Sequence, residues 1–205
     1  YWIQNVLILP MLTSATFGDW ESVLASSMPS ADLDNATAMA HYARGIALAA
    51  TDRAPQAESE LQAIYEISSR IGATDESEGP EIVVVIASQA LAGEIALRTG
   101  DAEAAAGHLS VAARLEDGMV YEEPPVWYLP IRHTLGRALL EADRPAEAES
   151  VYREDLVRFP ANGWSLAGLA NALEAQGRNA EAEEVREEYR QAWSAADIEL
   201  TGSRI

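Results

Sequence analysis

The chain has 205 residues and a formal net charge of −19, and all 14 of its basic residues are arginine. Such an acidic surface repels the phosphates of nucleic acids and the headgroups of anionic membranes, so neither is expected as a partner. The absence of cysteine excludes disulfides, thiolate metal sites and cysteine nucleophiles.

The predicted elements recur with a period of 34 residues, which is clearest where Gly136 and Ala170 occupy equivalent positions. Each copy predicts two antiparallel helices. A small residue at position eight lets the helices approach, Gly or Asp at position fifteen forms the turn, and Ala at position twenty packs the second helix on the first. In chain order the predicted copies are 4–37, which is degenerate, 38–71, 86–119, 129–162 and 163–196, followed by a short cap at 197–205.

A period of 34 residues with this pattern resembles the tetratricopeptide repeat. Such a repeat cannot bury its apolar face alone and must stack on its neighbours. The resemblance therefore implies an all-α fold, a right-handed solenoid of antiparallel helix pairs that forms a single stack over residues 1–205. The turns are expected at the fifteenth positions, which are Gly18, Asp52, Gly100, Asp143 and Gly177.

Extra residues interrupt the period at about 72–85 and 120–128. The first insertion is polar and acidic, so we expect a solvated loop rather than a calcium site. The second has two prolines before Trp127 and Tyr128, which predicts a rigid extended linker whose aromatic rings pack against the stack. The β-branched run after Glu81 looks strand-like, but it continues into a helical pattern, so we predict a helix with Pro80 in its first turn.

The stretch from Glu122 to Leu173, with its EEPPVWYLPIRHTLGRALL, YREDL and NGW motifs, resembles the C-terminal part of large bacterial tetratricopeptide repeat proteins. Segments Phe17–Leu24 and His41–Ala49 resemble further parts of these proteins. One departure is Leu129, where the family usually has Tyr. The resemblance implies that this chain is the C-terminal part of a longer protein, as its start at Tyr1 rather than Met also suggests. It implies no activity.

The first helix of each repeat lines the concave groove of such a solenoid, and this groove is the expected site for a protein or peptide partner. The groove mixes polar and apolar residues, which suits an extended or helical peptide. Without lysine, it does not predict a clamp for a terminal carboxylate. The residues that we expect to contact a partner are Tyr42, Arg98, His133, Arg137, Trp164 and Asn171.

The sequence offers few features that indicate a metal site, an exposed aromatic site or a catalytic site. The histidines lack the close spacing of a metal site, which leaves a pairing of His133 with Glu141 or with a neighbouring carboxylate as a hypothesis. The tryptophans are expected in the core, with Trp127 and Trp164 the candidates for exposure. No nucleophile elbow, phosphate loop or Ser/His/Asp arrangement is readable, so neither catalytic residues nor a cofactor are predicted.

Three interpretations remain open. The first is a non-enzymatic scaffold that binds a partner in its groove. The second is a structural segment that completes a longer solenoid or mediates self-association, and the third is an enzyme or small-molecule site shared with a missing N-terminal half. With no signal peptide visible, and with the apolar run Val6–Leu12 too short to span a bilayer, we expect a cytoplasmic location, the periplasm being the alternative.

Overall fold

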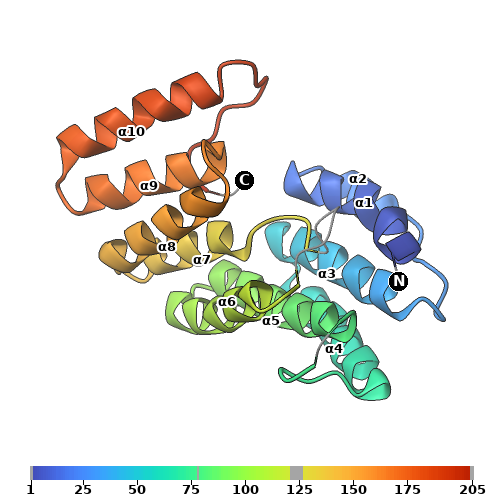
Figure 1. The fold of residues 1–205 in the computed structure, drawn as a ribbon. Coiled ribbons are helices and arrows are strands. Elements are labelled where there is room, and N and C mark those ends of the chain that lie inside the picture. The colour runs from blue at the N-terminus through green and yellow to red at the C-terminus, as the bar shows by residue number, and fades with distance from the viewer. Residues whose placement is uncertain (1, 78, 121–126, 204–205) are drawn as a thin grey trace. The chain divides into compact units, whose positions relative to one another are not determined.

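The computed structural model describes residues 2–77, 79–120 and 127–203. Within these ranges the chain forms ten α-helices and no strand, and consecutive helices pack as antiparallel pairs (Figure 1). The predicted all-α class and its architecture, that of a tetratricopeptide-type α-solenoid, are confirmed. The chain divides into two compact units, Tyr1–Leu129 and Pro130–Ile205, and each is described by itself. None of the helices in the described ranges is long and apolar enough to cross a membrane.

Unit 1 contains six helices, and α3 and α5 form its core. Most residues of these two helices are buried, and α5 packs against α3, α4 and α6. The helices are α1 (Trp2–Thr16), α2 (Trp20–Ala25), α3 (Asp34–Ala50), α4 (Ala54–Ile71), α5 (Glu81–Arg98) and α6 (Ala102–Asp117). The first pair is incomplete because α2 has only 6 residues, which agrees with the degenerate pattern there.

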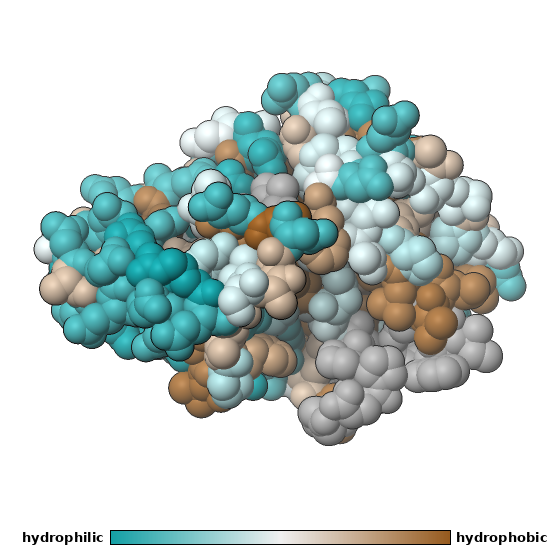
Figure 2. All heavy atoms as spheres, turned by 90° about the horizontal axis from the view of Figure 1, so that it is seen from above, coloured by the Kyte–Doolittle hydropathy of each residue, from teal (hydrophilic) through white to brown (hydrophobic). Residues whose placement is uncertain are grey.

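Unit 2 contains four helices, which are α7 (Ile131–Glu141), α8 (Pro145–Arg158), α9 (Gly163–Ala175) and α10 (Asn179–Ala192). Helix α9 is the central one, since it packs against each of the other three. The outer face of α10 is hydrophilic, as the teal surface on the left of Figure 2 shows, and its arginines and glutamates pair with each other along the helix.

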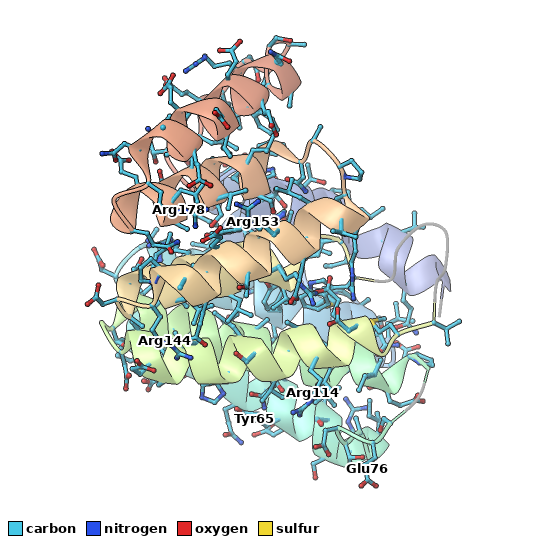
Figure 3. All side chains as sticks on the ribbon, turned by 60° about the vertical axis from the view of Figure 1, so that its left-hand side comes forward. Tyr65, Glu76, Arg114, Arg144, Arg153 and Arg178 are labelled. Carbon is cyan, nitrogen blue, oxygen red and sulfur yellow. The ribbon has the colours of Figure 1, made fainter. Side chains whose placement is uncertain are left out.

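An ion-pair network joins α8 to the turn between α9 and α10. Arg153 and Arg178, labelled in Figure 3, both contact Glu149, at 2.9 and 2.6 Å. Burial would raise the pKa of the Glu149 carboxyl, but bonds from Gln176 and from the two arginines outweigh it and lower that pKa below its usual value.

All five predicted turns are present. The φ angles are 73° at Gly18, 58° at Asp52, 85° at Gly100, 57° at Asp143 and 73° at Gly177. Glycine adopts this left-handed conformation without a steric penalty, and Asp is one of the few other residues that tolerate it. The repeat therefore ends each first helix by the predicted backbone geometry.

The close approach at position eight occurs, with one difference in the partner. A Cβ on Gly93 or Gly136 would lie within 2.6 Å of the second helix of its own pair, against Leu109 or Tyr152. A Cβ on Gly45 would instead lie 2.4 Å from Leu91, which belongs to α5. The absence of a side chain at Gly45 thus lets α5 of the next helix pair pack closely against α3.

The β-branched run is helical, as predicted, because it lies in the core of unit 1. Val83, Val84 and Ile86 are fully buried, and a helix that is apolar on all sides needs this burial. Helix α5 begins at Glu81, so Pro80 is its N-cap residue, one position before the predicted first turn. Most of the predicted rigid linker, residues 121–126, lies outside the described residues.

Candidate functional site

The six predicted contact residues divide between the units. Tyr42 and Arg98 belong to α3 and α5 of unit 1, and the other four belong to α7 and α9 of unit 2. In unit 1, Tyr42 is only 4% exposed, and its ring centroid lies 5.3 Å from that of Trp127 and 6.4 Å from that of Tyr128. Tyr42 therefore belongs to a packed aromatic cluster, whereas Arg98 is exposed at the end of α5.

In unit 2, His133 is part of a buried polar cluster. Its Nε2 lies 3.2 Å from Oδ2 of Asp155 on α8, and the hydroxyl of Ser165 on α9 donates to the same oxygen at 2.5 Å. Of the two pairings that the sequence left open for His133, the one with Glu141 is not formed, and the one with another neighbouring carboxylate is, at Asp155. Glu141 instead accepts from Arg137 at 2.8 Å, because Arg137 lies one helical turn away and His133 lies two.

This polar cluster does not have the arrangement of a hydrolase site. A nucleophilic serine needs a base as its hydrogen-bond partner, but Ser165 donates to the carboxylate rather than to the imidazole. Ser165, His133 and Asp155 are also at most 1% exposed, so a substrate does not reach them. Their contacts instead hold α7, α8 and α9 together. Among the described residues no group of three or more His, Asp or Glu side chains is placed to hold a metal ion.

Trp164 forms an aromatic wall at the start of α9. Its ring stacks on His133 at a centroid distance of 6.5 Å and meets Trp193 edge-on at 6.0 Å, and Trp193 stacks on Tyr189. The side chain of Asn162 caps α9 by accepting from the backbone N–H groups of Trp164 and Ser165. Trp164 and Trp127 are both buried, so packing accounts for the two tryptophans that were candidates for exposure.

The chain turns back after α10 and returns towards α7 and α9, as Figure 1 shows at the red end of the ribbon. We call residues 197–203 the tail segment. It has no helix or strand, yet Leu200 is 8% exposed and packs with Trp164 and Ala167 of α9. The tail segment therefore covers the predicted groove face of unit 2.

Side chains of α9 and α10 bind the backbone of the tail segment. The Asn171 amide donates to the carbonyl of Thr201 at 3.0 Å, and the indole N–H of Trp193 donates to the carbonyl of Ile198 at 2.8 Å. The Leu200 N–H donates to the hydroxyl of Tyr189 at 3.0 Å. These bonds recognise a main chain whatever its sequence.

Ser203 ends the described part of the tail segment in a buried polar pocket. Its hydroxyl donates to the carbonyl of His133 at 2.7 Å and lies 2.6 Å from the hydroxyl of Tyr152. Because Ser203 has one hydroxyl proton, Tyr152 is the donor in the second bond. Burial raises the pKa of Tyr152 well above its ordinary value, against the smaller lowering effects of Ser203 and Arg137, so the proton is retained.

A cavity of about 240 Å³ lies beside the tail segment. Arg186 and Arg190 of α10 line it together with Asn171 and with Glu199 of the tail segment. Both arginines also pair with glutamates, Arg186 with Glu174 and Glu183, and Arg190 with Glu183 and Glu187. The cavity leaves space next to the bound backbone, and the arginines that line it are paired with glutamates.

The structure thus brings together Trp164, Asn171 and the backbone of His133, all around the tail segment, with Arg137 close enough for its charge to act on Tyr152. Sequence reasoning missed Tyr152, Tyr189 and Ser203. Tyr152 had a usable signal, since a large ring at the aromatic position of a repeat fits between small residues on the neighbouring helices. Ser203 had none.

Comparison with known proteins agrees with the helical pairs. The tetratricopeptide repeat family model matches residues 38–63, 130–154 and 163–188, which fall within three of the predicted repeats. No curated protein and no solved structure matches the chain. With these matches and its paired helices, the chain contains tetratricopeptide repeats. Tetratricopeptide repeats generally mediate protein–protein interaction.

Proposed function

We propose that this protein is a non-enzymatic scaffold that binds a non-helical segment of a partner protein on α7 and α9 of unit 2. One observation carries the proposal: side chains on this face already hold a main chain, through Asn171 and the aromatic wall around Trp164.

The helices that form this face are held in place by contacts of their own. Tyr152 is packed between α7 and α9, and the polar cluster of His133, Asp155 and Ser165 fixes the same helices. A partner segment that takes the place of the tail segment therefore meets helices that are already in place. Backbone hydrogen bonds then supply affinity, and the apolar and hydroxyl pockets supply selectivity.

Burial decides which of the predicted contact residues can be tested by substitution. Tyr42 and His133 are packed inside their units, so their substitution is expected to perturb folding before it perturbs binding. Asn171 is the better test, since it is only partly buried and its side chain bonds the tail backbone.

The experiment is affinity purification with mass spectrometry from the native host, with full-length wild type beside an Asn171→Ala variant. Asn179→Ala serves as the matched control, because it makes the same substitution at an exposed position on α10. The proposal predicts a partner that the wild type and the control retain and that Asn171→Ala loses. Identical partners for all three proteins would contradict binding by this face.

A second candidate, a structural or self-associating role, rests on α1. Val6, Leu7 and Leu9 of this helix are 43%, 58% and 41% exposed, which is unusual for large apolar side chains that neighbour each other on one helix. Light scattering tests this role. A dimer that Leu7→Glu converts to a monomer would support it, and a monomer at every concentration would exclude self-association through α1.

A further inference from the structure

We propose that the tail segment is an internal ligand of the α7–α9 face, and that the partner segment which displaces it carries an apolar residue followed, three positions later, by a small hydroxyl residue. This inference rests on the proposed function and specifies its ligand and its regulation.

The tail segment is bound as a ligand is bound, by a few separate contacts rather than by regular structure. Three side chains hold its backbone at Ile198, Leu200 and Thr201, and none of these bonds belongs to a helix or a strand. A short irregular segment of this kind loses backbone entropy at every residue that becomes ordered, and this loss opposes the contacts that hold the segment in place.

Two side chains of the tail segment give the site its selectivity. Leu200 inserts against Trp164 and Ala167, with Tyr189 and Trp193 around it. Three residues later, Ser203 is 3% exposed and bonds the hydroxyl of Tyr152 and the carbonyl of His133. Because Ser203 is buried, a larger residue there would collide with its surroundings, and an apolar one would leave the Tyr152 hydroxyl without its acceptor, which weakens binding.

The intervening positions are permissive. Glu199 and Thr201 are exposed, and a Cβ on Gly202 would lie 3.6 Å from the Asn171 amide nitrogen, an ordinary contact distance. The recognised pattern therefore has the form Leu-x-x-Ser. Glu199 borders the cavity that Arg186 and Arg190 line, so an acidic residue just before the apolar one is compatible with the site.

Attachment in the same chain makes the tail segment a strong competitor. A tethered segment acts at an effective concentration on the order of millimolar, whatever its intrinsic affinity. An external segment binds only the fraction of molecules whose tail is displaced, so its apparent affinity falls by that fraction. A substitution that weakens the attachment of the tail segment therefore raises the apparent affinity for an external segment, although the groove itself is unchanged.

The test uses the full chain and a fluorescent peptide of residues 195–203, AADIELTGS, followed by anisotropy. In the tail-released variant, Leu200→Glu with Ser203→Glu, every groove residue is unchanged. We expect this variant to bind the peptide at least tenfold more tightly than the wild type does. The peptide that carries the same two substitutions is the matched control, and it should not bind.

Two further variants protect the test against misfolding. Ser203→Ala removes the hydroxyl contacts alone and should give an intermediate affinity, and Asn171→Ala added to the tail-released variant should weaken binding at least fivefold. Circular dichroism checks that each variant keeps its helices.

Equal affinity of the wild type and a folded tail-released variant would overturn the internal competition. Absence of binding to a folded tail-released variant would overturn the assigned pattern. In either case a host partner that depends on Asn171 would leave the proposed function standing. If the peptide result fails and no host partner depends on Asn171, the proposed function is contradicted as well.

Discussion

At the scale of single residues, Tyr152 connects the fold to the site. Its fully buried ring lies between Gly136 of α7 and Gly168 of α9, where an added Cβ on either glycine would come within 2.3 Å of it, and its hydroxyl reaches Ser203 of the tail segment. The same side chain therefore sets the spacing of the two groove helices and forms the floor of the polar pocket.

Gly168→Ala is predicted to destabilise the protein. The new methyl group would overlap the Tyr152 ring, and overpacking of this kind costs about 1–3 kcal/mol. Gly107→Ala is the control, since a Cβ on this exposed residue of α6 would meet nothing within 4 Å. It should gain up to about 1 kcal/mol from helix propensity. Urea unfolding measures both changes, and equal effects of the two substitutions would contradict the close packing at Gly168.

Glu60 makes unit 1 sensitive to acid. Burial tends to raise the pKa of this carboxyl, but contacts with His41 and Arg44 outweigh it and lower the pKa below 4.5. A lowered folded-state pKa contributes stability above the unfolded value, and this stability is lost as the pH falls through the folded value.

Glu60→Gln is therefore predicted to cost roughly 1–2 kcal/mol at pH 7, and less as the pH falls below the reference value of 4.5. Urea midpoints of the wild type and the variant should converge in acid. Glu58→Gln, on the exposed side of the same helix, should leave the midpoint nearly unchanged. A difference between wild type and Glu60→Gln that stays constant with pH would contradict this role.

At the scale of elements, α9 is placed by its cap. Asn162 accepts hydrogen bonds from the N–H groups of Trp164 and Ser165, at 3.0 and 3.4 Å, so the cap orients the residues that form the aromatic wall and the polar cluster. The motif NGW in the sequence thus has a physical role as the start of a groove helix.

Asn162→Ala is predicted to lower stability by about 1 kcal/mol, because two helical N–H groups lose their acceptor. Asn162→Asp keeps an acceptor at the same position and should retain most of that stability. Chemical denaturation compares the two variants. A loss in Asn162→Asp as large as that in Asn162→Ala would show that the cap is not the cause.

The helices were more predictable than the contacts that they make. The 34-residue period fixed the turns, because a left-handed residue such as Asp52 or Gly177 leaves a local signal in the sequence. The start of α5 was predictable as well, because Pro80 precedes a β-branched run that continues into a helical pattern, and the burial of that run accounts for its helical conformation.

At the scale of the molecule, the site was predictable only in part. Position in the repeat singled out Asn171 and Trp164 on a first helix, and the structure has both in contact with the tail segment. It did not reveal that Tyr42 and His133 are buried, since their environment depends on aromatic and polar contacts with distant residues such as Trp127 and Asp155. Nor did it reveal the tail contacts, because a binding segment without regular structure has no periodicity to read.

The measurement that tests the central claim most directly is an NMR titration of the tail-released full chain with the unlabelled peptide of residues 195–203. The account predicts saturable shifts on α7 and α9, including the side-chain amide of Asn171 and the indole of Trp164, with little change on α3 and α5. Shifts that concentrate outside unit 2, or a spectrum that does not change at saturating peptide, would contradict the claim that this face binds a peptide chain.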